Sequence, residues 1–556
     1  MKLNGSEIIV ACLKEQEVDT VFGFPGGAVL NIYDALYQHK HAINHILTSH
    51  EQGAAHAADG YARSTGKVGV VFATSGPGAT NLVTGLATAY MDSIPMVAFT
   101  GNVTTELLGK DSFQEVDISG ITMPITKHNY IVKDVKDLAQ TIRDAFYIAK
   151  EGRPGPVLID VPKDVTAAVT EYTPQEKRVY TANESVNVKD LEKTVKMIKK
   201  ANKPFIFAGG GINISKAHKE FEEFVEKIDA PVGVSLMGFG SIDSDHPSFT
   251  GMIGMHGTRV SNVGVNNCDL MIVIGARFSD RVISKAATFA KKAKIIHIDI
   301  DPAEINKNIA TTHHVIGDVK VVLAQLNQLI DEKLEHSSWM TQVAKWKTEH
   351  PIKITDETKR PSDILKALSQ VMPKDAIVST EVGQHQMWAA QFFRHDPVRK
   401  FLTSGGLGTM GYGTGAAIGA QVGNLDKRVV NVAGDGSFRM NCNELATIAR
   451  YQLPVVILIM NNKTLGMVRQ WQTLFYNQRY SQTTLDTPVD WVALAAAFGV
   501  KGMHLRLEDD PVAILTAAFA LGGPVVIDCE IALDNKVYPM VAPGASIDDM
   551  IEESES

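Results

Sequence analysis

Cysteine is scarce in this chain, and the few cysteines that it has are far apart. There are four, Cys12, Cys268, Cys442 and Cys529, and no two of them form a C-x-x-C pair. Zinc sites and dithiol motifs need such close spacing. The pattern therefore indicates neither a zinc site nor a disulfide framework, and it is typical of a protein in a reducing compartment.

An excess of basic residues is also missing. The chain has 54 Lys and Arg against 62 Asp and Glu, which gives a formal net charge of −8 at pH 7. No basic block compensates for this balance, so nothing in the sequence favours binding to a phosphate backbone. We expect no nucleic-acid partner.

Long apolar runs and a targeting segment are absent as well. The longest apolar runs, such as Pro454–Met460, are far shorter than the roughly 20 helical residues that span a bilayer. Near the N-terminus, Glu7 and Glu15 interrupt the apolar sequence early, unlike the core of a signal peptide. We therefore expect a cytoplasmic protein that makes no membrane contact.

What the chain does have is many short apolar blocks. Its 556 residues, 45% of them hydrophobic, suffice for about three domains. Short β-forming runs alternate with helical patterns, which predicts an α/β fold of doubly wound parallel sheets. We predict three such domains, over residues 1–165, 190–330 and 361–545, and the first and third could share one architecture.

Two charged segments are expected to connect these domains. The first, Thr166–Asp190, is expected to be a linker, and the second, Asp331–Lys359, to contain an amphipathic helix with Trp339 and Trp346. The strands expected in the first two domains are Thr20–Phe24, Lys67–Thr74, Met96–Thr100, Pro156–Val161, Phe205–Ala208, Val232–Ser235, Leu270–Ile274 and Lys294–Asp299.

A polar turn on each of two expected strands predicts a metal site. Gly434-Asp435-Gly436 follows the apolar run Val429–Ala433, and Asn461-Asn462 follows the strand Val455–Met460. A helix over Cys442–Tyr451 between the strands brings the two turns to one edge of a parallel sheet. A carboxylate and an amide are hard oxygen ligands that suit Mg²⁺ bound to phosphate. Asp435 and Asn462 are the predicted ligands, although Gly-Asp-Gly alone is usually a structural turn.

Glu51 stands at the start of an expected helix of small residues, within SHEQGAAHAADGYAR. By itself it would be a first-turn Glu that the helix dipole favours. The Gly-Asp-Gly turn, its interval and Asn461-Asn462 together, however, resemble the metal-diphosphate signature of the thiamine diphosphate enzymes. Those enzymes need a poorly solvated carboxyl group at N1′ of the aminopyrimidine, because the resulting imino tautomer removes the weakly acidic C2 proton. The resemblance implies that Glu51 is this group and that two subunits share each site.

From Gly5 to Pro543 the chain is similar to the catalytic subunits of the acetohydroxyacid synthase, or acetolactate synthase, family. The matching stretches include FGFPGGA, SGPGATN, FQEVDI, SGGLGTMGYG, LGMVRQWQ and VYPMVAPGA. The resemblance implies a pyrimidine-binding first domain, a flavin-binding central domain and a diphosphate-binding third domain. The implied cofactors are thiamine diphosphate, Mg²⁺ and FAD, the last in a structural role.

The resemblance also implies the residues around thiamine diphosphate. Gly27, Phe113, Gln114 and Lys163 would line the channel to the reactive carbon; their ordinary interpretations are a turn glycine, a core aromatic, a solvated amide and a surface lysine. Met410 would be the apolar wedge that bends the cofactor, although such a Met is usually core. The implied contacts to the diphosphate end are Gln384, His385, Gly408, Gly434, Gly436, Ser437 and Met467, with Thr464 beside the metal.

Flavin binding is implied for the central domain. A Gly triplet after an expected strand is weak evidence alone, and a carboxylate at a strand end can accept a ribose hydroxyl. The implied contacts are Arg153, Gly209, Gly210, Met255, His256, Gly257, Thr258, Arg277 and Asp299. Two positions depart from the family pattern: Ser279 replaces an Asp near the flavin, and Thr414-Gly415 replaces Leu-Pro, which we expect to affect only a helix start.

Two residues are implied in substrate binding. Arg281 would hold the carboxylate of the second substrate, where otherwise it would form a weak surface salt bridge. Trp471 would line the acceptor pocket and favour 2-ketobutyrate over pyruvate by about 1–3 kcal/mol through one methylene; otherwise it would be core. The catabolic acetolactate synthases, which need no flavin, lack this tryptophan and the Arg-Phe-x-Asp-Arg motif, so the resemblance favours the biosynthetic branch of the family.

The implied reaction is a carboligation on small 2-keto acids. Pyruvate is decarboxylated, and the hydroxyethyl unit is joined to pyruvate or 2-ketobutyrate, giving 2-acetolactate or 2-aceto-2-hydroxybutyrate for valine, leucine and isoleucine synthesis. A homodimer or homotetramer and a separate small regulatory subunit are expected. The alternatives are a pyruvate oxidase, a 2-keto acid decarboxylase, and a catalytically silent flavin-binding module.

Overall fold

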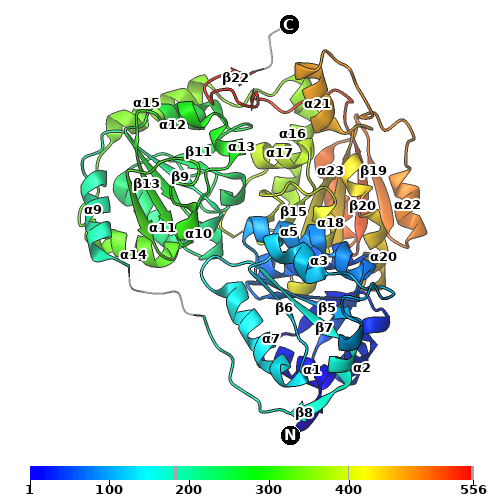
Figure 1. Cartoon of the computed structure of the whole chain (residues 1–556). Coiled ribbons are helices and arrows are strands. Elements are labelled where there is room, and N and C mark those ends of the chain that lie inside the picture. The colour runs from blue at the N-terminus through cyan, green and yellow to red at the C-terminus, as the bar shows by residue number, and fades with distance from the viewer. Residues whose placement is uncertain (181–185, 399, 553–556) are drawn as a thin grey trace.

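A computed structural model describes residues 1–180, 186–398 and 400–552 of the chain. It contains three parallel sheets of six strands each, and they form three lobes, coloured blue to cyan, green, and yellow to red along the chain in Figure 1. The predicted α/β class is therefore confirmed. Each sheet lies inside one of the expected domain ranges, whose limits stay a prediction.

The sheet of the first domain has the order β3-β2-β4-β5-β7-β6. Its inner strands are buried along their whole length, as expected where helices cover both faces. The strands are β2 (Thr20–Gly23), β3 (Asn44–Leu47), β4 (Gly69–Ala73), β5 (Met96–Asn102), β6 (His128–Ile131) and β7 (Pro156–Pro162). The helices are α1 (Gly5–Glu15), α2 (Leu30–Gln38), α3 (Glu51–Thr65), α4 (Pro77–Asn81), α5 (Val83–Asp92), α6 (Ile118–Thr122), α7 (Val135–Lys150) and α8 (Lys163–Ala167).

The third domain repeats this topology, with the order β16-β15-β17-β18-β20-β19. In both sheets the second strand lies at one edge and the fifth at the other, so the two domains share one architecture. The strands are β15 (Ile377–Thr380), β16 (Lys400–Leu402), β17 (Val429–Gly434), β18 (Val455–Asn461), β19 (Lys501–Leu505) and β20 (Val525–Glu530). The helices are α16 (Asp356–Val371), α17 (Gln384–Phe392), α18 (Tyr412–Gly423), α19 (Asp435–Phe438), α20 (Leu445–Arg450), α21 (Gly466–Phe475), α22 (Trp491–Ala497) and α23 (Pro511–Ala520).

The central domain is wound differently, in the order β11-β10-β9-β12-β13-β14. This order reverses between β9 and β12, which is the dinucleotide-binding arrangement. The strands are β9 (Pro204–Ala208), β10 (Val232–Val234), β11 (Phe249–Met252), β12 (Leu270–Ile274), β13 (Lys294–Asp299) and β14 (His313–Ile316). The helices are α9 (Val188–Ile198), α10 (Gly210–Ile214), α11 (His218–Ile228), α12 (Arg259–Asn267), α13 (Asp280–Ile283), α14 (Val319–Leu329) and α15 (Ser337–Glu349).

The first and third domains pack together through α3 and α18. Both helices consist mainly of small residues, and their backbones touch: a Cβ added at Gly419 would lie 1.7 Å from the Ala57 carbonyl oxygen, and one at Gly60 would lie 2.1 Å from that of Ala416. One continuous apolar core includes both helices and reaches the faces of both sheets. The first and third domains of one chain therefore pack against each other through a shared apolar core.

Two expectations about the connections are wrong in detail. The first linker contains β8 (Val169–Glu171), which pairs antiparallel with β1 (Lys2–Asn4) near the N-terminus; its residues 181–185 lie outside the described part. The third domain's first helix, α16, already begins at Asp356, inside the second connecting segment, and includes Pro361. The expected helix with Trp339 and Trp346 is confirmed as α15. Across the described ranges, no helix is long and apolar enough to cross a membrane.

Candidate active site

The two turns of the predicted metal-diphosphate motif lie at the carboxyl ends of two paired strands. β17 ends at Gly434, which lies beside Met460 of β18, and Asp435 begins α19. Asp435 and Asn462 line one pocket, entirely within the third domain. The other predicted residues that line it are Gln384, His385, Met410, Gly434, Gly436, Ser437, Thr464 and Met467. Gly408 does not line this pocket; it lies in the same loop as Met410, with a φ of +69°.

The donor atoms of this pocket fit a magnesium ion with diphosphate. Burial raises the pKa of the Asp435 carboxyl to about 7, and a bound cation would keep it charged. The amide nitrogen of Asn462 donates to Gln384 Oε1 at 3.3 Å, which leaves the amide oxygen of Asn462 for a metal. Within the described residues no three His, Cys, Asp or Glu gather into a metal cluster, so phosphate oxygens would complete the coordination.

The side chains of α17 face this pocket. Gln384 Nε2 donates to Gln470 Oε1 at 3.0 Å and to the Asn535 carbonyl at 2.7 Å, which fixes its orientation. Nε2 of His385 is buried and has no hydrogen-bond partner in the part of the chain that is described. A buried unpartnered nitrogen is costly, so a cofactor atom would satisfy it.

The loop that carries Gly408 and Met410 is held by the first domain. Asp92 accepts hydrogen bonds from the N–H groups of Gly405, at 3.2 Å, and Gly406, at 2.7 Å. Arg63 pairs with Asp92 at 2.9 Å and donates to the Thr403 carbonyl at 3.0 Å. This buried network was not predicted from the sequence. Its signal there was a charged residue, Arg63, within a helix of small residues.

Glu51 is the first residue of α3 and is only 8% exposed. Its Oε2 accepts a hydrogen bond from Asn81 Nδ2 at 2.9 Å, so the carboxylate lies inside the first domain. The pocket that contains Asp435 has no lining residue from this domain. Within one chain, the structure therefore does not bring Glu51 and Asp435 into one pocket.

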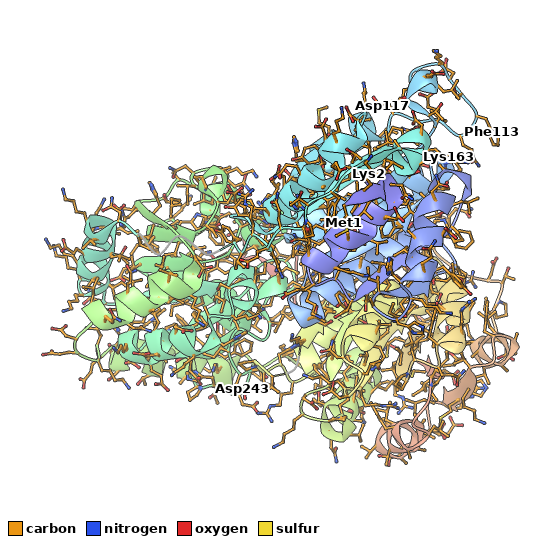
Figure 2. The ribbon with its side chains drawn as sticks, turned by 90° about the horizontal axis from the view of Figure 1, so that it is seen from below. Met1, Lys2, Phe113, Asp117, Lys163 and Asp243 are labelled. Carbon is orange, nitrogen blue, oxygen red and sulfur yellow. The ribbon has the colours of Figure 1, made fainter. Side chains whose placement is uncertain are left out.

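The four predicted channel residues lie beyond the carboxyl ends of the first sheet and are exposed in a single chain. Gly27 follows β2, Phe113 and Gln114 follow β5, and Lys163 follows β7. Phe113 is 88% exposed, so its interpretation as a core aromatic is wrong. Figure 2 shows Phe113 pointing away from the domain, at the same margin as Lys163.

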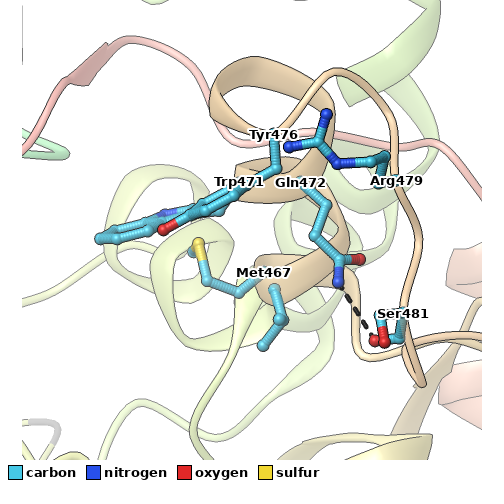
Figure 3. A pocket seen from close by; sticks show the side chains of 7 residues that line it. Met467, Trp471, Gln472, Tyr476, Arg479 and Ser481 are labelled. Atoms are coloured by element: carbon cyan, nitrogen blue, oxygen red, sulfur yellow. Dashed lines mark hydrogen bonds between the residues drawn. The ribbon is translucent and has the colours of Figure 1, made fainter.

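Trp471 lies on α21 in the wall of an open pocket. Figure 3 shows this pocket, which is lined by Met467, Val468, Trp471, Gln472, Tyr476, Arg479 and Ser481. The guanidinium carbon of Arg281, from the central domain, is 6.0 Å from the centre of the Trp471 ring. Met467 and Val468 line this pocket and the Asp435 pocket alike, so the two cavities adjoin along α21.

Arg281 also pairs with Asp280 at 2.8 Å, with both side chains more than half exposed. Such an exposed pair contributes little stability. The guanidinium group of Arg281 can therefore exchange Asp280 for a ligand carboxylate at little cost in free energy.

The predicted flavin residues gather at the carboxyl ends of the central sheet. Gly209 follows β9, where a Cβ would lie 2.2 Å from the Gly275 carbonyl oxygen, Arg277 follows β12, and Asp299 ends β13. The stretch Met255–Thr258 follows β11, and Nδ1 of His256 is buried without a partner within the described ranges. Burial also lowers the pKa of His256 to about 4. Gly210, the first residue of α10, adjoins Gly209.

Arg153 belongs to the first domain and ties it to the central one. It donates to Glu304 at 2.8 Å, Asp301 at 3.3 Å and Ser93 at 2.8 Å. Its guanidinium group is thus already engaged by protein groups in this structure. A flavin contact would have to share these partners or replace them.

Comparison with known proteins agrees with this geometry. The chain matches the family descriptions "Thiamine pyrophosphate enzyme, N-terminal TPP binding domain" over residues 3–121, "central domain" over 191–326 and "C-terminal TPP binding domain" over 381–529. It is 45% identical to an acetolactate synthase large subunit of Cyanidium caldarium, covering 98% of this chain and 96% of the relative. It is also 45% identical to the large subunit of acetolactate synthase isozyme 2 of Escherichia coli, covering 99% and 100%. The chain belongs to the acetolactate synthase family.

Membership of the acetolactate synthase family makes the chain a thiamine diphosphate-dependent enzyme. One buried acid near the Asp435 pocket, Glu381, was not predicted from the sequence. Glu381, at the end of β15, accepts from the Thr414 N–H and hydroxyl and from the Ser437 hydroxyl, each at 2.9 Å. Burial raises the pKa of Glu381. The expectation that Thr414-Gly415 affects only a helix start is therefore too narrow, because Thr414 shares this acid with a predicted diphosphate contact.

Proposed function

We propose that this chain is an acetolactate synthase of branched-chain amino-acid biosynthesis. It decarboxylates pyruvate and joins the remaining two-carbon unit to a second 2-keto acid, giving 2-acetolactate from pyruvate or 2-aceto-2-hydroxybutyrate from 2-ketobutyrate. The observation that supports the proposal is that two cavities adjoin: the pocket of Asp435 and Asn462 and the pocket of Trp471 share Met467 and Val468. A substrate beside Trp471 would thus lie next to the cofactor.

The residues of the third domain would hold the cofactor. Asp435, Asn462 and Thr464 would bind Mg²⁺, and Ser437, Gln384 and His385 would bind diphosphate oxygens, with Gly434 and Gly436 allowing close approach. Met410 would support the bend of the molecule. When bound, thiamine diphosphate supplies a nucleophilic carbon and an electron sink for decarboxylation.

Glu51 would hold a proton at N1′ of the aminopyrimidine in a neighbouring subunit. Its separation from the Asp435 pocket of its own chain and the exposure of Phe113, Gln114 and Lys163 support a homodimer or homotetramer with shared sites. Lys163, Gln114 and Gly27 of the first subunit would then line the channel that leads to the reactive carbon and exclude water from it.

Arg281 and Trp471 would select the second substrate. The guanidinium group would pair with its carboxylate, and the indole would contact the side chain, where an extra methylene is worth about 1–3 kcal/mol. FAD would bind the central domain at Gly209, Gly210, Arg277, Asp299 and the stretch Met255–Thr258 in a structural role. The name "large subunit" of several relatives supports a separate small regulatory subunit, and we infer a cytoplasmic location.

Product analysis tests the proposal. The purified chain is supplied with thiamine diphosphate, Mg²⁺ and pyruvate, with and without 2-ketobutyrate and with and without FAD. We expect 2-acetolactate and 2-aceto-2-hydroxybutyrate as the main products. Free acetaldehyde as the main product, or consumption of oxygen in proportion to pyruvate, would instead identify a decarboxylase or an oxidase.

A further inference from the structure

A carboxylate of the third domain holds the segment that leads into α3. Glu444, the last residue of the 3-10 turn η7 (Cys442–Glu444), is fully buried. Its Oε1 accepts hydrogen bonds from the N–H groups of Ser49, at 3.1 Å, and His50, at 3.0 Å. The Thr447 hydroxyl donates to Oε2 at 2.6 Å. These bonds join the two domains immediately before Glu51.

The fit between this carboxylate and α3 is close. A Cβ added at Gly53 would lie 2.3 Å from Glu444 Oε1, so only glycine lets the helix approach so near. Two further bonds hold the same segment: the Ser49 hydroxyl donates to the Asn443 carbonyl at 3.0 Å, and the Leu47 N–H donates to the Tyr451 hydroxyl at 2.8 Å. The third domain therefore fixes the chain from Leu47 to His50.

Glu444 is an unusual residue to place there for stability alone. In the described residues it forms no ion pair with a cationic side chain, and burying a carboxylate without one is costly. The N-terminal end of α3 partly offsets the cost, because unpaired helix N–H groups favour an anion. An apolar group of similar size would be cheaper to bury, but it could not direct these N–H groups.

We propose that Glu444 is a positioning residue for Glu51, because it fixes the first turn of α3 and with it the direction of the Glu51 carboxylate. The inference rests on the proposed function, in which Glu51 bonds the aminopyrimidine. Glu444 lies on the segment that begins with the predicted metal ligand Asp435. The segment of each chain that binds the cofactor would thus orient Glu51 of the same chain, and this Glu51 would act in the site that is shared with a second subunit.

Hydrogen–deuterium exchange of the full-length protein without cofactors tests the contact itself. In Glu444→Gln we expect amides of residues 47–53 to exchange about tenfold faster, while those of residues 434–437 do not change. Glu15→Gln is the matched control: Glu15 also accepts a backbone N–H, from Gln175 at 2.9 Å, but in a remote part of the first domain. It should leave residues 47–53 unchanged. Equal exchange of residues 47–53 in Glu444→Gln and the unaltered protein would overturn the proposal.

The loaded protein gives a second readout, the exchange rate of the thiamine C2 proton measured by NMR after acid quenching. We expect Glu444→Gln to slow it by about 10- to 100-fold, with affinities for thiamine diphosphate and Mg²⁺ unchanged within about threefold. Glu15→Gln should exchange at the normal rate. Thr447→Val removes one donor to Glu444 and should slow exchange less; it decides the question if Glu444→Gln does not fold.

The outcomes separate the two proposals. If Glu51→Gln slows C2 exchange and neither Glu444→Gln nor Thr447→Val does, Glu444 has no positioning role and the proposed function stands. If Glu51→Gln itself exchanges at the normal rate, the role of Glu51 in the proposed function fails, whatever Glu444 does.

Discussion

The first and third domains have the same strand order but different chemistry at the carboxyl edge. After β17 the third domain places Asp435, whereas after the corresponding β4 the first domain has the uncharged turn Thr74-Ser75-Gly76. Just before α18 lies the loop of Met410, whereas the corresponding helix α3 begins with Glu51. One architecture thus carries the predicted metal-diphosphate site at the edge of one domain and the Glu51 carboxylate at the corresponding edge of the other.

This difference explains why neither domain alone would be sufficient to bind and activate thiamine diphosphate. Asp435 and its neighbours are predicted to bind an anion and its metal, but the described residues that line their pocket include no second carboxylate for the far end of the cofactor. Glu51 is such an acid, yet it points into its own domain and not into its own chain's pocket. The following predictions test this division of labour, from the largest expected effect to the smallest.

Removing the acid of the first domain should have the largest effect. Glu51→Gln preserves shape and hydrogen bonding to Asn81 but cannot carry the proton, so we expect turnover to fall by at least about 100-fold. Thiamine diphosphate and Mg²⁺ should still bind, as measured by calorimetry. Near-normal turnover in a folded variant would contradict the role assigned to Glu51.

Mixing two inactive chains should restore activity. If Glu51 of one subunit and Asp435 of another form each site, a dimer of Glu51→Gln and Asp435→Ala chains contains one intact site. Random pairing after co-expression would then give about a quarter of the normal activity, and mixed dimers purified through two different affinity tags would give about half. Absence of recovery in purified mixed dimers would show that both residues act within one chain.

The first domain also contains a buried acid, whose effect on stability should depend on pH. Asp160 accepts a hydrogen bond from Thr100 at 2.7 Å, and burial raises its pKa to about 7, above its ordinary value. The stability that this group contributes is therefore present at low pH and lost as pH rises to about 7 and above. The free energy of unfolding of Asp160→Asn minus that of the unaltered protein should therefore be larger at pH 8 than at pH 5, by up to a few kcal/mol. Denaturant unfolding at both pH values measures this difference, and a constant difference would refute it.

The junction of the two domains should not tolerate a methyl group. Gly419→Ala would force α18 away from the Ala57 carbonyl, and we expect a loss of about 1–3 kcal/mol in the free energy of unfolding. Gly523→Ala is the matched control, because a Cβ there meets nothing within 4 Å. Urea unfolding compares the two variants; equal stability would mean that the helices can separate without cost.

The smallest effect should be on substrate choice. Trp471→Leu removes indole contact at the acceptor pocket, so the preference for 2-ketobutyrate over pyruvate should fall by about tenfold. Competition between the two keto acids measures it through the product ratio. Phe475→Leu, on the same helix and 5.9 Å from the indole ring, is the control and should change the ratio less.

Local patterns were enough to predict the features that depend on neighbouring residues. The turn at Asp435 directly after β17 and Glu51 at the start of α3 followed from runs and turns in the sequence, and both are confirmed as positions. Their roles stay predictions. The shared architecture of the first and third domains is likewise confirmed by the strand order.

Contacts between distant parts of the chain could not be predicted in this way. Glu444 bonds to Ser49, Asp92 to Gly405 and Glu381 to Thr414, and in each pair neither residue carries a local signal of its partner. The strand β8 was missed for the same reason: three residues become a strand only because β1 lies beside them.

The position of α21 limits how the substrate range can change. Met467 and Val468 line both the Asp435 pocket and the Trp471 pocket. A substitution there that admits a bulkier keto acid would therefore also weaken the binding of thiamine diphosphate. Of these two pockets, Tyr476 and Arg479 line only the one that contains Trp471. A search for variants with new acceptors should begin at those two positions, where selectivity can vary without loss of cofactor.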